Sequence, residues 1–299
     1  MRARGLLLGA ALALLAACSP PGRGRISIGA KNFTEQLILA ELVAQHLEAR
    51  TGLTVVRRSN LGGTLICHQA LKAGEIDLYV EYTGTALTAI LDQKPSGDPG
   101  EVYRRVKEAY GEQFDLEWTE PLGFNDTFAI VVRGEDARRY GLKTISDAAP
   151  RTPEWRAGFG YEFMERPDGF AGLAATYGLA FGQPPRTMEL GLLYRALVEK
   201  QVDLVAGNST DGVIAANDLV VLADDRRYFP PYEAAPVVRR AALARHPALR
   251  AALAELGGKI DEAAMRAMNA AVDGEHRDPK EVAQEFLAGA GLGSGAARP

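Results

Sequence analysis

The stretch from residue 71 to residue 85 constrains the fold more than any other part of the chain. An apolar helical pattern stops at Gly74, and a short apolar run around residues 78–80 follows it. Glycine just past a periodic apolar run is typical of a helix C-terminus. The apolar run has the length of a buried strand and leads into a polar, aromatic segment that contains Tyr82 and Thr85. In open α/β sheets ligands bind beyond the carboxyl ends of strands, so we expect both side chains to face a ligand.

A second stretch repeats this pattern later in the chain. The pair Ala-Leu, followed seven residues later by Asp-Leu, occurs at residues 70–78 and again at residues 196–204. In this register Tyr82 corresponds to Asn208. Such a short match can arise by coincidence, and it is also what two similarly built α/β lobes facing one cleft would produce.

Predicted strands and helices alternate along the chain, which favours an α/β fold with parallel sheets. Asn32 and Glu35 have the spacing of a capping box, so a helix is expected to begin there and to end at Gly52. Residues 118–132, which contain two chain-breaking residues, are interpreted as a crossing from one lobe to the other. The predicted strands cover residues 26–29, 53–57, 78–80, 128–132, 158–163, 202–205, 219–222 and 235–238.

The N-terminus has the features of an export signal. Arg2 and Arg4 precede an apolar run at residues 6–17, which is short for a membrane span and fits a secretory signal. The run ends in small residues before Cys18, which resembles a bacterial lipobox; the alternative is an ordinary signal peptide with a chance cysteine. In the lipoprotein interpretation only Cys67 remains as a free thiol, so no intramolecular disulfide can form.

Composition and motifs argue against two classes of function. The formal net charge is −4 and no basic block is present, so we expect no nucleic-acid partner. The sequence contains no Walker loop, no Gly-x-Ser-x-Gly elbow and no His-Glu-x-x-His, and none of its four histidines follows a predicted strand. We therefore predict no catalytic residue, no cofactor and no metal.

Aromatic and charged side chains gather at the predicted strand exits. Ring faces attract quaternary ammonium groups, and an arginine can hold a carboxylate through two hydrogen bonds. Each tyrosine alone could simply pack in the core, and Lys31 alone could be a solvated surface lysine, but their convergence favours a site for a zwitterion. The candidate ligand-binding residues are Lys31, Tyr82, Thr85, Asp126, Phe128, Arg166, Asn208 and Tyr232.

Seven segments, in order along the chain, resemble the substrate-binding proteins of osmoprotectant ABC importers, which bind glycine betaine, choline, carnitine or related compounds. The resemblance runs from residue 26 to residue 287. It implies a two-lobed type II periplasmic-binding-protein fold, with two crossover segments and closure around a central ligand cleft. The segments are Ala-Lys-Asn-Phe-Thr-Glu-Gln at 30–36, Asn-Leu-Gly-Gly-Thr at 60–64, Gly-Glu-Ile-Asp-Leu-Tyr-Val-Glu-Tyr-Thr-Gly-Thr at 74–85, Gly-Phe-Asn-Asp-Thr-Phe at 123–128, Arg-Pro-Asp-Gly at 166–169, Ser-Thr-Asp-Gly at 209–212 and Phe-Pro-Pro-Tyr at 229–232.

The resemblance also implies roles for the candidate residues. Asp126 matches a residue that lines the cationic end of the ligand. Two positions depart from the family pattern: Phe128 replaces a common tyrosine, and Asn208 replaces an aromatic residue. The resulting hypothesis is that the pocket takes a larger or more polar relative of betaine, or binds betaine weakly. In the family, positions matching Tyr82, Phe128, Asn208 and Tyr232 form an aromatic cage, and positions matching Lys31, Thr85 and Arg166 hold the carboxylate.

The same resemblance implies an organisation and a set of partners. The partners are a zwitterionic or cationic solute, an ABC permease with its ATPase, and the membrane through lipidated Cys18. The protein is expected to be exported, periplasmic or extracytoplasmic, and to be a monomer. One alternative is a receptor or sensor of the same fold for an ergothioneine-like or other polar zwitterion; an exported enzyme is disfavoured by the missing catalytic groups. The expected segments are a signal peptide at 1–17, a tether at 18–25, a first lobe at 26–124 and 210–288, a second lobe at 125–209, and a flexible tail at 289–299.

Overall fold

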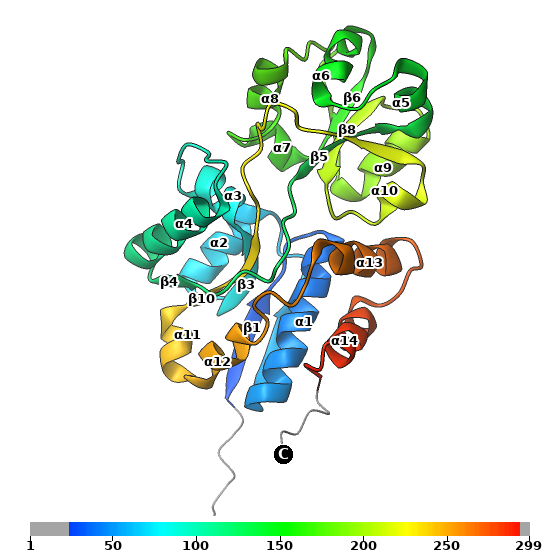
Figure 1. Ribbon diagram of the computed structural model, residues 1–299. Helices are drawn as coiled ribbons and strands as arrows, with labels where there is room; N and C mark the ends of the chain where they lie inside the picture. The colour runs from blue at the N-terminus through cyan, green and yellow to red at the C-terminus, as the bar shows by residue number, and fades with distance from the viewer. Residues whose placement is uncertain (1–23, 294–299) are drawn as a thin grey trace, which may run out of the picture.

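The computed structural model describes residues 24–293, which form two α/β lobes joined by two crossing segments (Figure 1). Each lobe is built on a five-stranded sheet. The first sheet has the order β2 (Thr54–Arg58), β1 (Arg25–Gly29), β3 (Leu78–Tyr82), β10 (Ala234–Arg239) and β4 (Leu116–Trp118). The second has the order β7 (Arg186–Thr187), β6 (Ala157–Phe159), β8 (Leu204–Asn208), β5 (Phe128–Arg133) and β9 (Leu219–Leu222).

Helices cover both faces of each sheet, and two clusters of buried apolar side chains pack against each one. Helices of the first lobe are α1 (Thr34–Thr51), α2 (Thr64–Ala73), α3 (Thr83–Thr85), a π-helix (Ala86–Ile90), α4 (Pro99–Phe114), α11 (Arg240–Arg245), α12 (Ala248–Ala254), α13 (Glu262–Asp273) and α14 (Pro279–Gly289). Those of the second are α5 (Gly134–Tyr140), α6 (Ile145–Ala148), a 3-10 helix (Ala149–Glu154), α7 (Tyr161–Glu165), α8 (Phe170–Tyr177), α9 (Leu190–Val198) and α10 (Val213–Ala216).

The sheets are mixed, so the expectation of parallel sheets was wrong for part of each. β1 runs parallel to β2 and β3, but β10 is antiparallel to β3 and β4. In the second sheet β5 is antiparallel to β8 and β9. The reason is the path of the chain: β5 and β10 each follow a crossing segment and enter their sheet from the cleft side, opposite to the strands that lead out to the cleft.

The repeated Ala-Leu and Asp-Leu pattern does mark two similarly built strands. β3 and β8 both begin at the leucine of the repeat, and both hold the third place in their sheet. Each has one parallel and one antiparallel neighbour. Tyr82 and Asn208 are the last residues of the two strands, as the register predicts.

Three local expectations were wrong. The capping box at Asn32 is absent: α1 begins at Thr34 after extended Phe33, with no side-chain cap, because tertiary contacts engage the Glu35 carboxylate instead. The strand predicted at 158–163 ends at Phe159, and α7 follows. The second lobe extends beyond residue 209, because β9 pairs with β5.

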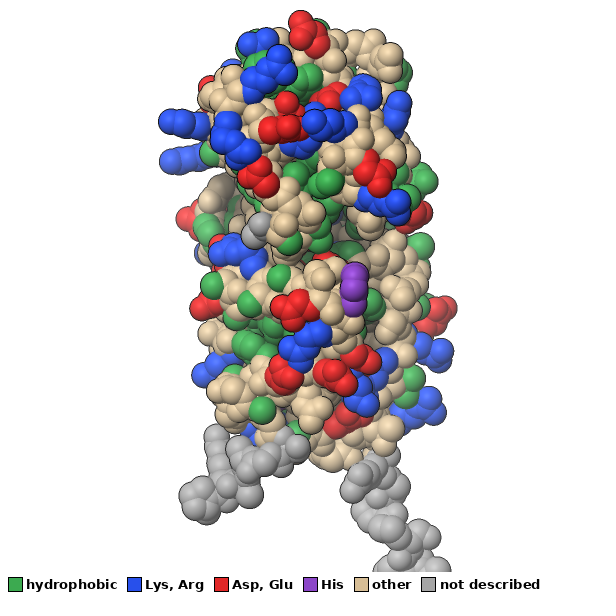
Figure 2. Space-filling model, turned by 90° about the vertical axis from the view of Figure 1, so that its right-hand side faces the viewer, with side chains coloured by type: hydrophobic (Ala, Val, Ile, Leu, Met, Phe, Trp, Pro, Cys, Tyr) green, Lys and Arg blue, Asp and Glu red, His purple; other side chains and the backbone are tan. Residues whose placement is uncertain are grey.

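The expected signal peptide, the lipidated Cys18 and most of the tail lie outside the described residues, and α14 extends to Gly289. Across residues 24–293, no helix combines the length and apolar composition needed to cross a bilayer. On the face seen in Figure 2, charges of both signs are interspersed over both lobes, and apolar side chains are visible in the hollow between them.

Candidate functional site

A cavity of about 940 Å³ lies between the lobes and is lined by residues of both. It opens at the carboxyl ends of β1, β3, β6 and β8, where the sequence placed its candidate residues. The structure brings all eight candidates to this one cavity: Lys31, Tyr82, Thr85, Asp126, Phe128, Arg166, Asn208 and Tyr232.

Lys31 is a buried, paired cation rather than a solvated surface lysine. Its side chain is 4% exposed, and Nζ donates to Oε1 of the fully buried Glu81 at 2.5 Å. Nζ also donates to the hydroxyl of Thr64 at 3.0 Å and lies 5.1 Å from the centre of the Tyr82 ring. A carboxylate that approached Lys31 would therefore meet an ion pair and not an isolated positive charge.

Arg166 follows helix α7, not a strand, and is paired as well. Its guanidinium donates to both carboxylate oxygens of Asp168, at 2.8 and 2.5 Å, and to the hydroxyl of Thr85 at 3.1 Å. Burial opposes the charge, but the bonds to Asp168 prevail and the pKa of Arg166 is raised. The hydroxyl of Tyr232 also donates to Asp168, at 2.6 Å. These contacts join the second lobe to Thr85 and Tyr232.

The aromatic candidates fall into two groups. Tyr82 stacks with Phe33 in the first lobe, with ring centres 6.4 Å apart and planes 26° apart. Phe128 and Tyr232 lie edge to face at 5.7 Å, and the Arg166 guanidinium lies 5.0 and 5.9 Å from their ring centres. Tyr82 and Tyr232 both belong to the core cluster of the first lobe, and Phe128 begins β5 of the second lobe, so the three rings line the cavity from both lobes.

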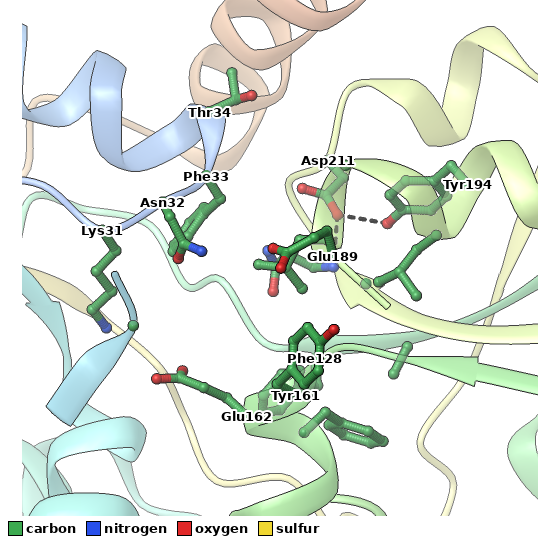
Figure 3. Close-up of a pocket in the computed structure, with 18 of the residues that line it drawn as sticks. Lys31, Asn32, Phe33, Thr34, Phe128, Tyr161, Glu162, Glu189, Tyr194 and Asp211 are labelled. Atoms are coloured by element: carbon green, nitrogen blue, oxygen red, sulfur yellow. Dashed lines mark hydrogen bonds between the residues drawn. The ribbon is translucent and has the colours of Figure 1, made fainter. Parts of the chain in front are cut away.

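Asn208 presents an amide at the position where the family pattern described above has a ring. It ends β8 directly opposite Phe128 in the antiparallel pair. Its backbone N–H donates to Asp211 at 2.8 Å, and the Tyr194 hydroxyl donates to the same carboxylate oxygen at 2.6 Å (Figure 3). Burial raises the pKa of Asp211 to about 6. The wall of the second lobe is therefore polar and acidic beside Phe128.

Two further carboxyls, those of Glu35 and Asp126, share the hydroxyl of Thr210, and Glu35 also accepts from the Tyr82 hydroxyl. The Thr210 hydroxyl lies 2.5 Å from Oε2 of Glu35 and 2.8 Å from Oδ1 of Asp126. A hydroxyl donates only one proton, so the second contact requires a proton on a carboxyl. Burial raises the pKa of Glu35 to about 6, and burial together with the charge of Glu35 raises that of Asp126 well above its usual range.

Sequence reasoning missed several lining residues, including Asn32, Phe33, Glu162 and Asp211. Glu162 extends from α7 toward the first lobe, where it accepts the backbone N–H of Thr64 at 2.5 Å (Figure 3). Asn32 and Phe33 directly follow Lys31 beyond the end of β1, which was an available signal. No local pattern indicated Glu162, because residues 158–163 were predicted as one strand and the start of helix α7 within them was not expected. Among residues 24–293, no cluster of three or more His, Cys, Asp or Glu side chains is placed to hold a metal ion.

Comparison with known proteins identifies the family. Residues 24–289 match the profile of the substrate-binding domain of ABC-type glycine betaine transport systems. The carnitine transport binding protein OpuCC of Listeria monocytogenes is 37% identical over 289 residues, covering 94% of this chain and 93% of its own length. A glycine-betaine-binding protein of Pseudomonas aeruginosa is 38% identical over 272 residues, covering 88% and 86%.

A solved structure agrees with both sequence comparisons. The crystal structure of a glycine betaine/carnitine/choline ABC transporter protein is 36% identical and superposes with a TM-score of 0.75, covering 89% of this chain and 99% of the other. This match and the two-lobed architecture identify a periplasmic-binding-protein fold. The chain belongs to the family of substrate-binding domains of ABC-type glycine betaine transport systems, and it is a transport binding protein rather than an enzyme.

Proposed function

We propose that this chain captures a quaternary-ammonium solute in the cavity between its lobes and delivers it to an ABC permease. The observation that carries the proposal is the convergence of three rings on one cavity, from β3, from β5 and from the second crossing segment. These rings belong to Tyr82, Phe128 and Tyr232.

The chemistry of a trimethylammonium group suits this wall. The group has no N–H to donate, so ring faces and nearby carboxylates are the means by which a protein can recognise it. Each ring contact contributes about 0.5–2 kcal/mol, with the larger values where water is excluded. Asp211, with its pKa of about 6, adds negative charge to the same cavity at neutral pH, and Asp126, whose pKa burial raises well above its usual range, adds a carboxyl.

The two cations that would hold a solute carboxylate already have carboxylate partners within the protein. Lys31 is already paired with Glu81, and Arg166 with Asp168. Part of the attraction that either cation would offer to a solute carboxylate is therefore cancelled. We propose that the ammonium group contributes most of the affinity, and that Lys31, Thr85 and Arg166 orient the carboxylate of a betaine without dominating its binding.

A polar zwitterion is the second candidate solute, for a transport protein or for a sensor of the same fold. The observation that favours it is the second-lobe wall, where Asn208 and Asp211 offer an amide and a carboxylate instead of a ring. Such a wall would suit a solute with hydrogen-bond donors beside its ammonium group, such as ergothioneine.

Calorimetric titration against glycine betaine, choline, carnitine and ergothioneine tests both proposals. We expect binding of choline at one site, with glycine betaine no tighter than choline. Selective binding of ergothioneine would favour the second candidate. An absence of binding to all four solutes would refute the proposed function.

Export and anchoring form a separate proposal. We propose that residues 1–17 are removed as a signal and that Cys18 then carries the lipid, because small residues precede it after a short apolar run. The anchored monomer would work with a permease and its ATPase on the extracytoplasmic side of the membrane. The intact mass of protein extracted from membranes tests this: a mature chain starting at Cys18 with acyl groups supports it, and an unmodified chain contradicts it.

A further inference from the structure

Phe33 is an aromatic residue of the cavity with no assigned role. It precedes α1 with extended backbone, φ −144° and ψ 158°, so it is not part of the helix surface. Its side chain is half-buried against the first-lobe core and lines the cavity. Figure 3 shows its side chain beside that of Asn32 at the first-lobe edge of the cavity, with Asp211 and Glu189 on the opposite wall.

The ring of Phe33 is held in place by its neighbour. It stacks on Tyr82 with ring centres 6.4 Å apart. The Tyr82 hydroxyl is itself fixed, because it donates to Glu35 at 2.7 Å and accepts from Gln36 at 3.1 Å. Phe33 and Tyr82 therefore form a two-ring wall in the first lobe. On the second lobe, Asn208 lies opposite Phe128 in the strand pair, and Phe163 packs edge to face against Phe128 at 4.8 Å.

Phe33 also differs from the three rings of the proposed function in its electrostatic surroundings. Lys31 lies over Tyr82, and Arg166 lies over Phe128 and Tyr232, at distances of 5.0–5.9 Å. Within the described part of the chain, no cation–ring contact involves Phe33. A cation from solution would therefore find the ring face of Phe33 unshared, as it would those of Tyr161, Phe163 and Tyr194, whereas it would compete with a protein cation for the rings of Tyr82, Phe128 and Tyr232.

We propose that Phe33 is a wall of the ammonium cage and a specificity-determining residue, supplying from the first lobe the ring that position 208 lacks in the second. This inference rests on the proposed function. It predicts that Phe33 discriminates a cationic solute from a neutral one of the same shape, because the ring quadrupole attracts charge and apolar contact alone does not.

The test uses choline and its neutral isostere, in which a tert-butyl group replaces the trimethylammonium group. Phe33→Leu keeps apolar bulk but removes the ring. We expect it to weaken choline binding about 3- to 30-fold and to leave binding of the isostere nearly unchanged. Phe33→Tyr keeps a ring face and should preserve the wild-type ratio. Adding Asn208→Tyr to Phe33→Leu should restore choline binding, because it returns a ring to the cage from the opposite lobe.

A matched control is Phe114→Leu, which removes a ring that lies under Lys72, at 4.9 Å, and does not line the cavity. It should leave the ratio of choline to isostere affinity at its wild-type value. Equal losses for both solutes in Phe33→Leu, or no loss for either, would overturn the role of Phe33 while leaving the proposed function intact. If the wild-type chain binds neither choline nor glycine betaine, the proposed function fails, and the inference fails with it.

Discussion

Strands β3 and β8 are built alike and end differently. Each is the third strand of its sheet, and each is preceded by an aspartate that holds the parallel neighbour. Asp77 accepts the backbone N–H of Ser27 at 2.9 Å, and Asp203 accepts that of Arg156 at 2.9 Å. Both aspartates also accept hydrogen bonds from arginine side chains.

The exits of the two strands have different chemistry. β3 ends in Tyr82, a buried ring whose hydroxyl donates to Glu35. β8 ends in Asn208, a half-buried amide whose backbone N–H donates to Asp211. The two lobes therefore share the strand arrangement and its supporting aspartate, but they differ in the residue that faces the cavity. The aspartates are expected to support the fold in both lobes, whereas the ring is expected to bind solute in one lobe only.

The largest expected effect tests the shared scaffold. Asp77→Ala and Asp203→Ala should each lower the free energy of unfolding by about 3 kcal/mol, because each leaves a backbone N–H and at least one arginine without its partner. Chemical denaturation measures both losses. Asp218→Ala, which removes an exposed partner of Arg138, should leave the unfolding midpoint nearly unchanged. A large loss from only one of the two aspartates would break the structural equivalence of β3 and β8.

The second effect tests the difference between the exits. Tyr82→Ala should weaken choline binding by about 30-fold, since it removes one ring and also the surface on which the Phe33 ring stacks. Asn208→Ala should weaken it by about threefold or less, because an amide side chain has no ring face. Calorimetry gives both values, with Tyr82→Phe as the control that keeps the ring. A larger loss at Asn208 than at Tyr82 would reverse the assignment of the two walls.

A smaller effect is expected when β8 is made to end in a ring, as β3 does. Asn208→Tyr should strengthen choline binding by about three- to tenfold, because it adds a ring beside Phe128. The same titration should reveal weaker binding of any solute that uses the amide of Asn208. If glycine betaine binds tightly to the wild-type chain and Asn208→Tyr changes nothing, the hypothesis that Asn208 alters solute preference is wrong.

The smallest effect is a pH dependence of binding. Burial raises the pKa values of Glu35 and Asp211 to about 6, so both lose protons as the pH rises through that value. A bound cation favours the ionised carboxylates and lowers these pKa values. Choline affinity should therefore rise a few-fold between about pH 5 and about pH 7, with release of protons on binding. Titrations in buffers of different ionisation enthalpy detect the protons, and Asp211→Asn should reduce the rise. An affinity that falls over this range would contradict the account.

The position of the cavity could be predicted from the sequence, because local patterns indicate where strands end. Tyr82 and Asn208 end short apolar runs, and Lys31 follows another, whereas Phe128 begins β5. Strand exits account for Lys31, Tyr82 and Asn208, whereas Arg166 follows helix α7, and Asp126 and Tyr232 reach the cavity from the crossing segments.

Long-range pairing was beyond such reasoning. Glu81 lies fifty residues from Lys31, and no local pattern indicates that the two form a buried ion pair. Glu35 was assigned to a helix cap from its spacing, but its carboxylate contacts Tyr82, Thr210 and Asn269 instead. The direction of β5 and β10 depends on where the chain crosses between the lobes. An apolar run of strand length does not indicate this direction.

A structure of the chain with choline bound tests the central claim most directly. The account predicts the ammonium nitrogen within about 6 Å of the ring centres of Tyr82 and Phe128, with the lobes closed around it. Choline bound beside Glu189 or elsewhere in the cavity, with its ammonium group away from these rings, would contradict the account.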